Sequence, residues 1–260
     1  HTVIIKGNFT NYGTVKFTNL PYPIYNAFPP TVAGATTGAA SVYFQGASDN
    51  TLDCNGITAF YNLIVDKGID QTFKLTINST NYSYFRLFGA NLLAPEAAGL
   101  SDPNLRKALW IRTGTVVLKG SVIIPSLSEG IAANADYYIP FKGALVVDGV
   151  DVVVLSSADD YREVNIAYTV AAPDNATIGV TKGGFSALDI FGKLQINDGY
   201  LSTRESGGLI TSNVASGQLI INGGTIDAKQ LLSSTGSASY RQTGGIFILR
   251  GRFQRTPAAY

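Results

Sequence analysis

The stretch Gly192-Lys193-Leu194-Gln195-Ile196-Asn197-Asp198-Gly199-Tyr200-Leu201 has two glycines separated by six residues, with apolar side chains alternating between them. It recurs at 217–226 and 244–253, so that the first glycines of the three copies lie 25 and 27 residues apart. Looser copies begin at Gly114 and Gly143, and the 49 residues from Gly143 to Gly192 leave room for a degenerate copy with its strand at 164–170. Self-similarity with a period of roughly 20–50 residues indicates a solenoid, in which each repeat forms one coil.

The apolar residues of each copy alternate with polar ones, which is typical of a half-buried β-strand. Valine, isoleucine, phenylalanine and tyrosine favour strands, and glycines at the ends of each copy let the backbone turn a corner. The sequence therefore predicts an all-β protein, a right-handed parallel β-helix that forms a single domain over 1–260 with coils of 25–29 residues. Roughly ten such coils, stacked about 4.8 Å apart, would form a rod on the order of 50 Å long.

Three polar side chains occupy the same position in their copies, five residues after the first glycine: Asp148, Asn197 and Asn222. In a stack of coils, equivalent side chains lie directly above one another, and amides arranged in this way exchange hydrogen bonds along the stack. We therefore expect a structural ladder at this position, in preference to a functional site.

Two segments depart from the repeat. Residues 1–20 have the strand pattern of a first coil, but 21–40 contain four prolines and predict an irregular excursion or a cap, because proline lacks the N–H that a sheet needs. Residues 92–107 are too long for a corner and predict an insertion with a short helical turn. The chain starts without methionine and reaches Tyr260 without a recognisable closing element, so we expect a fragment of a longer chain.

The composition narrows the classes of function. Basic and acidic residues number 19 and 18, and the net charge of +1 gives no reason to expect nucleic acid or an anionic membrane as a partner. No apolar run approaches the roughly 18 residues of a membrane-spanning helix, so membrane insertion is not expected. The single cysteine, Cys54, excludes an internal disulfide framework, fits an extracellular bacterial protein and is expected to be a small buried side chain.

Residues 41–77 carry motifs that predict three strands with glycine corners: Val42-Tyr43-Phe44-Gln45-Gly46, then Leu52-Asp53-Cys54-Asn55-Gly56, then Phe60-Tyr61-Asn62-Leu63-Ile64-Val65-Asp66-Lys67-Gly68. Near the C-terminal end stand Asn222-Gly223-Gly224-Thr225-Ile226 and Tyr240-Arg241-Gln242-Thr243-Gly244-Gly245. This set of motifs resembles the β-helical repeats of very large bacterial cell-surface adhesins. Gliding and gut-dwelling bacteria export those adhesins by the type IX secretion system.

The resemblance implies an extracellular protein on the bacterial cell surface. Its partners would be the secretion machinery of the outer membrane and an extracellular polysaccharide or other surface. The implied function is structural or adhesive: a stiff β-helical rod that presents loops for attachment. An inert spacer without a ligand has the same sequence features and stays open as an alternative.

Two groups of side chains are candidates for contact with a ligand. Insertions in solenoids form loops that often bind, which makes the 92–107 insertion the first candidate. Its polar residues are Asp102, Asn104, Arg106 and Lys107. The second candidate is a basic patch that could face an acidic glycan, formed by Arg250, Arg252 and Arg255. The insertion could equally cover exposed core, and the patch could be an exposed coil face without a ligand.

A carbohydrate-active enzyme is the alternative function, because parallel β-helices also carry hydrolases and lyases of acidic polysaccharides. Glycoside hydrolysis needs two carboxylates about 5–9.5 Å apart, and the adjacent pair Asp159-Asp160 is the candidate. The sole histidine is His1, so the histidine motif of the polygalacturonase family has no counterpart. Motifs for a Ca²⁺ loop, a Cys/His metal site or a phosphate loop are absent as well. A solvated turn is the better interpretation of the aspartate pair. The sequence therefore predicts a protein that is not an enzyme and holds no metal and no cofactor.

Overall fold

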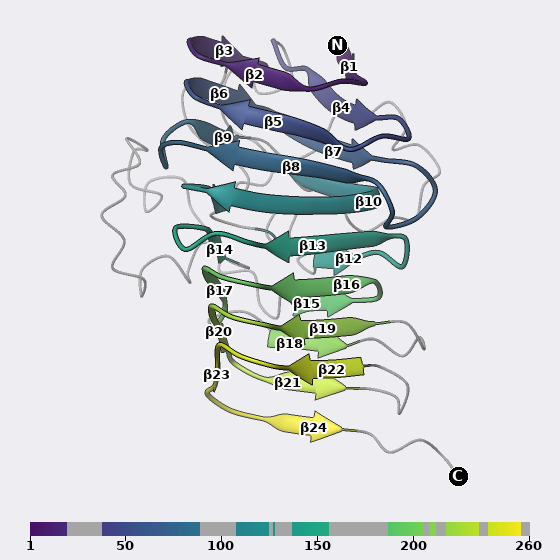
Figure 1. Cartoon of the computed structure of the whole chain (residues 1–260), viewed down its shortest axis with the longest axis vertical. Coiled ribbons are helices and arrows are strands. Elements are labelled where there is room, and N and C mark those ends of the chain that lie inside the picture. Colours follow the sequence, from purple (N-terminus) through teal and green to yellow (C-terminus); the bar gives the residue numbers. More distant parts are fainter. Residues whose placement is uncertain are drawn as a thin grey trace.

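The structure, a computed structural model, consists of β-strands joined by turns throughout the residues that it describes (Figure 1). These are residues 1–19, 38–88, 108–124, 127, 137–155, 187–204, 208–211, 217–233 and 239–255. The strands are β1 (Thr2–Ile5), β2 (Phe9–Asn11), β3 (Thr14–Lys16), β4 (Ser41–Gln45), β5 (Asn50–Cys54), β6 (Ile57–Phe60), β7 (Asn62–Asp66), β8 (Lys74–Ser79), β9 (Phe85–Leu87), β10 (Leu109–Gly120), β11 (Ile123–Ile124), β12 (Tyr137–Ile139), β13 (Gly143–Val147), β14 (Val153–Leu155), β15 (Ala187–Ile190), β16 (Lys193–Ile196), β17 (Tyr200–Thr203), β18 (Gly208–Thr211), β19 (Gln218–Ile221), β20 (Thr225–Ala228), β21 (Leu231–Ser233), β22 (Ser239–Gln242), β23 (Ile246–Leu249) and β24 (Phe253–Arg255).

Each coil contributes short strands, and equivalent strands of successive coils pair in parallel. The first three coils are β1–β2–β3, β4–β5–β6 and β7–β8–β9. In the fourth coil the long strand β10 pairs with β7 through its first half and with β8 through its second half. The later coils again run in threes, from β12–β13–β14 to β21–β22–β23 (Figure 1).

One wall of strands runs the length of the described stack, in the order β2–β5–β8–β10–β13–β16–β19–β22, and we call it the central wall. Its neighbours are parallel throughout, so the prediction of a parallel β-helix is confirmed. Eight layers at about 4.8 Å spacing give the described stack a length of roughly 35 Å. The expectation of ten coils and 50 Å was too large, since several coils carry long loops.

The core lies between the walls and is built from the inward residues of each strand. Along the central wall, one inward column consists of Leu75, Val116, Leu145, Leu194 and Leu219, which are register partners and are all fully buried. Burial alternates strictly along β8 and β16, as the period-two pattern predicts. Removal of this apolar surface from water is the main source of stability of the stack.

The 49 residues between Gly143 and Gly192 contain no additional coil in the stack. Strand β13 pairs directly with β16, with Ala144 opposite Lys193 and Val147 opposite Ile196. Strands β14 and β17 are also direct neighbours. The expectation of a hidden copy was therefore wrong. The segment 164–170, proposed as its strand, lies outside the described residues.

The copy at 244–253 is out of phase with the copies at 192 and 217. Strand β23 pairs with β20, so that Ile246 stacks on Thr225 and Phe247 on Ile226. The central-wall partner of β19 is instead β22, where Tyr240 stacks on Leu219. The glycine-plus-alternation phrase thus occurs in two different walls. Coil length also varies more than predicted, since Gln218 and Ser239, 21 residues apart, are partners.

The segments with family-like motifs also form more strands than expected. Residues 41–77 contribute β4 to β8, which belong to two successive coils, instead of three strands. The first coil at 1–20 is confirmed by the pairing of β1, β2 and β3 with the second coil. Most of the 21–40 excursion and all of the 92–107 insertion lie outside the described residues.

A lysine is buried at the corner where β10 passes from one wall to the next. The φ of Gly114 is 91°, and a Cβ there would lie 2.5 Å from the Cβ of Lys67. The Lys67 side chain is fully buried, and its Nζ donates to the carbonyl oxygen of Gln45 at 3.2 Å and to Oδ1 of Asn50. Burial disfavours the ammonium and lowers the pKa of Lys67 from its ordinary value of 10.5, although the nearby Asp49 carboxylate opposes the shift.

This buried lysine predicts a pH dependence of stability. Between the folded-state pKa of Lys67 and 10.5, the unfolded chain binds a proton that the folded chain lacks, so stability rises with pH across that interval. We expect the free energy of unfolding to rise from neutral pH toward pH 10.5 more steeply in the natural protein than in Lys67→Met. Urea denaturation at a series of pH values measures this difference. The exposed Lys16→Met is the control, and identical profiles for the natural protein and Lys67→Met would refute the explanation.

Candidate functional site

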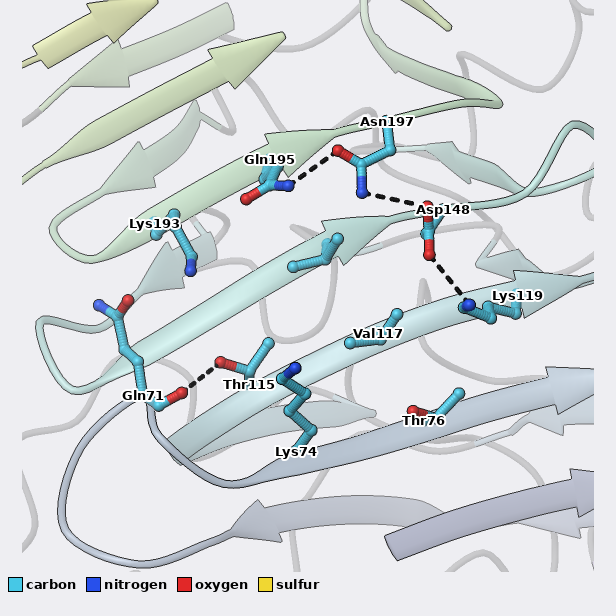
Figure 2. A pocket seen from close by; sticks show the side chains of 11 residues that line it. Gln71, Lys74, Thr76, Thr115, Val117, Lys119, Asp148, Lys193, Gln195 and Asn197 are labelled. Carbon is cyan, nitrogen blue, oxygen red and sulfur yellow. Dashed lines mark hydrogen bonds and ion pairs between the residues drawn. The ribbon is translucent and has the colours of Figure 1, made fainter. Parts of the chain in front are cut away.

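The outer face of the central wall carries a depression of about 300 Å³ that spans strands β8, β10, β13 and β16 (Figure 2). It is lined by Gln71, Lys74, Thr76, Thr115, Val117, Lys119, Val146, Asp148, Lys193, Gln195 and Asn197. Apart from Gln71, these are outward residues of consecutive strands, so the register of the stack brings them together.

The hollow arises because the two middle strands carry short outward side chains. Thr115 and Val117 on β10, with Ala144 and Val146 on β13, form the floor and are at most 8% exposed. The strands on either side, β8 and β16, carry long outward side chains at the ends of the depression, namely Lys74 and Lys193. Figure 2 shows Lys74 and Lys193 on the side of the depression opposite to Lys119 and Asp148.

The depression has a positive charge. It contains three lysines and one aspartate, a formal net charge of +2. Lys119 is paired with Asp148, with 3.1 Å between Nζ and Oδ2. The ammonium groups of Lys74 and Lys193 have no ion-pair or hydrogen-bond partner among the described residues, so they are available to an anionic ligand.

A ladder of polar side chains borders the depression and continues beyond it, as predicted for Asp148, Asn197 and Asn222. Asn197 donates from Nδ2 to Oδ1 of Asp148 at 3.0 Å, and Asn222 donates to Oδ1 of Asn197 at 2.9 Å. Thr243 adds a further rung, because its hydroxyl donates to Oδ1 of Asn222 at 3.0 Å. The ladder is confirmed, and it fixes one long edge of the depression.

Removal of the middle rung should destabilise the stack. Asn197 accepts hydrogen bonds from Asn222 and from Gln195 (2.8 Å), and donates one to Asp148. We expect Asn197→Ala to lower the free energy of unfolding by about 1–2 kcal/mol, since each net hydrogen bond contributes about 0.5–1.5 kcal/mol and the site is half-buried. Urea denaturation measures the loss. Lys193→Ala, on the same strand but without such bonds, should change stability by less than about 0.5 kcal/mol; equal losses for the two variants would contradict the role of the ladder.

The predicted arginine patch is divided between different contacts. Arg250 donates to both carboxylate oxygens of Asp227, at 2.6 and 2.7 Å, and Asp227 also accepts from the Tyr200 hydroxyl at 3.3 Å. Arg252 is exposed beyond the end of β23, and Arg255 ends β24 in a different wall. The charge of Arg250 is therefore already compensated within the protein.

Several predicted site residues lie outside the described residues. They are the insertion residues Asp102, Asn104, Arg106 and Lys107, and the acidic pair Asp159 and Asp160. Cys54, by contrast, is described and fully buried, as expected, and burial raises the pKa of its thiol to about 11. Such a thiol is a poor nucleophile at neutral pH.

Two searches of the described ranges gave negative results. No group of three or more His, Cys, Asp or Glu side chains in these ranges could hold a metal ion. Within the same ranges, no helix has the length and apolar character needed to cross a membrane.

The sequence did not predict the depression, although its cations follow a recognisable signal. Lys74 and Lys193 each occupy the first outward position of their central-wall strand, before an inward leucine. This equivalence becomes visible only when the register through β10 and β13 is known, because the two lysines are 119 residues apart in the sequence.

Comparisons of the chain with protein-family models, with curated proteins and with solved structures gave no match. The likeness to adhesin repeats therefore rests on the sequence motifs, and its coarser part, an all-parallel β-solenoid, agrees with the strand pairing of the described coils.

Proposed function

We propose that the protein is a structural and adhesive segment of a secreted bacterial cell-surface protein, a stiff rod that attaches to extracellular polysaccharide or another surface. The observation that carries the proposal is the unbroken pairing of the central wall from β2 to β22. In such a stack the backbone bonds to the coils on either side, and the apolar core is continuous. A force along the rod is thereby shared among many hydrogen bonds.

The secretion route and the location are proposals that rest on the adhesin-like motifs. A type IX exported protein would meet the outer-membrane secretion machinery and remain at the cell surface. The described surface adds a physical argument for attachment. The depression on the central wall is polar and positively charged, and Lys74 and Lys193 are its cations without a described partner. A pure spacer has no need of such a surface.

A glycoside hydrolase is less well supported by the chemistry of the depression. Among the described residues that line it, the one carboxylate is Asp148, and both of its oxygens are engaged, by Lys119 and by Asn197. The two-carboxylate mechanism requires a second acid a few ångströms away. Asp159 and Asp160, which the sequence offered for this role, are not among the described residues.

A polysaccharide panel tests the proposal. The purified chain is applied to immobilised neutral and acidic polysaccharides with and without Ca²⁺, and both retention and the release of new reducing or unsaturated ends are measured. We expect retention without release. Release of ends that is lost in Asp159→Ala or Asp160→Ala would make the protein an enzyme and overturn the proposal. Absence of retention on every polysaccharide would contradict attachment to glycans.

A further inference from the structure

We propose that the depression on the central wall binds a linear carboxylated polysaccharide, a polymer that contains uronic acids, with its chain laid along the axis of the stack. The inference rests on the proposed attachment function and assigns to it a ligand class and a site. Neither the ladder nor the core depends on the two lysines that would hold the ligand, because their ammonium groups make no described contact.

The spacing of the cations suits a polymer along the axis. Lys74, Thr115, Ala144 and Lys193 are register partners on four consecutive strands. Three spacings of about 4.8 Å separate the Cα atoms of the two lysines by roughly 14 Å along the axis. The short side chains between them leave space for the chain of a ligand. A polymer with carboxylates on successive sugar rings would meet one ammonium at each end of the hollow.

The floor and the rim also match a sugar chain. Val117 and Val146 form an apolar strip on the floor, which suits the C–H faces of sugar rings. Gln195 uses its Nε2 to donate to Asn197, which leaves its Oε1 to accept from a sugar hydroxyl. The Thr76 hydroxyl lies at the opposite end of the same outward column.

Nucleic acid is a poorer fit for this depression. Single-stranded nucleic acids are held by aromatic side chains on which bases stack, and no aromatic residue lines the depression. The protein as a whole has a net charge of only +1, whereas proteins that bind polyphosphates are strongly basic. A ligand with a carboxylate on each sugar and no base agrees better with two isolated ammonium groups.

The test compares a double variant with a charge-matched control. Lys74→Gln/Lys193→Gln removes the two available cations. Lys16→Gln/Lys229→Gln removes two exposed lysines elsewhere on the rod. Binding to polygalacturonate, alginate and hyaluronate is measured by affinity electrophoresis, with fully methyl-esterified polygalacturonate as the uncharged form of the same backbone. Circular dichroism confirms that both variants are folded.

We expect the natural protein to bind at least one uronate polymer and to bind the esterified form weakly. The Lys74/Lys193 variant should raise the Kd about tenfold, since each exposed ion pair contributes a few-fold, and added salt should weaken binding by the natural protein. The control variant should bind within about twofold of the natural protein.

The failures of the site and of the function are distinguishable. If a uronate polymer binds equally to the natural protein and to the Lys74/Lys193 variant, the site is wrong and attachment occurs elsewhere. If only neutral polysaccharides are retained, the ligand class is wrong, although attachment to glycans stands. If no polysaccharide of either kind is retained, both the inference and attachment to glycans are overturned.

Discussion

Replacement of Phe60 by alanine should lower the free energy of unfolding by about 3–5 kcal/mol, the usual cost of a buried Phe→Ala change. Phe60 is fully buried on β6, and its ring stacks on that of Phe17 with centroids 5.3 Å apart. Phe85 on the next coil contacts the other side, with centroids 5.9 Å apart. Removal of the ring leaves a cavity between two coils, because backbone hydrogen bonds fix their spacing.

The loss should be local as well as large. Each coil contacts only its neighbours, so hydrogen exchange should accelerate most in the first three coils and least near β19 and β20. Urea denaturation gives the total loss. Phe141→Ala is the matched control, because Phe141 is 60% exposed and should contribute little. A loss below about 1 kcal/mol for Phe60→Ala would show that this aromatic column does not join the coils.

Gly192→Ala should cost at least about 3 kcal/mol, because the neighbouring coil occupies the space that the new methyl group needs. A Cβ at Gly192 would lie 2.1 Å from the carbonyl oxygens of both Gly143 and Pro140. Both are backbone atoms and cannot rotate away. Relief of the clash requires β13 and β16 to separate, which lengthens the hydrogen bonds between them.

A glycine without such a neighbour provides the comparison. Gly7 has no atom within 4 Å of its ideal Cβ, and its φ is not positive. Gly7→Ala should therefore leave the thermal unfolding temperature nearly unchanged, whereas Gly192→Ala lowers it by many degrees. Equal temperatures for the two variants would contradict the close approach of the coils at Gly192.

The sequence predicted features that depend on a fixed offset within one copy. Strand periodicity placed Leu194 and Leu219 in the core, and the five-residue offset from the first glycine placed Asn197 next to Asn222. Both are local patterns that repeat whatever the length of the loops. For this reason the fold class and the ladder could be predicted from the residues alone.

Features that depend on loop length or on several coils could not be predicted in this way. Backbone hydrogen bonds set the register, and a loop of any length can leave the stack between two strands, as it does between β14 and β15. The same glycine-plus-alternation phrase serves two walls, which misplaced the copy at 244–253. The depression requires side chains from four strands, and the positions of Lys74 and Lys193 become equivalent only in three dimensions.

The direct stacking of β13 on β16 is the central claim, since the wall, the ladder and the spacing of the lysines all depend on it. Val146 and Gln195 are register partners, and both point outward. We therefore propose to introduce Val146→Cys and Gln195→Cys into a Cys54→Ser background, with Val117→Cys and Gln195→Cys as the control pair. Val117 is the partner of Val146 and lies two layers from Gln195.

Adjacent layers place Cα atoms about 4.8 Å apart, within the range of a disulfide, whereas two layers place them roughly 9.6 Å apart, beyond it. Mild oxidation followed by peptide mass mapping measures which pair closes. We predict an intramolecular disulfide between positions 146 and 195 and none between 117 and 195. Failure of the 146–195 pair to close in the folded protein would mean that a coil lies between them, and the account of the stack and of its binding surface would be wrong.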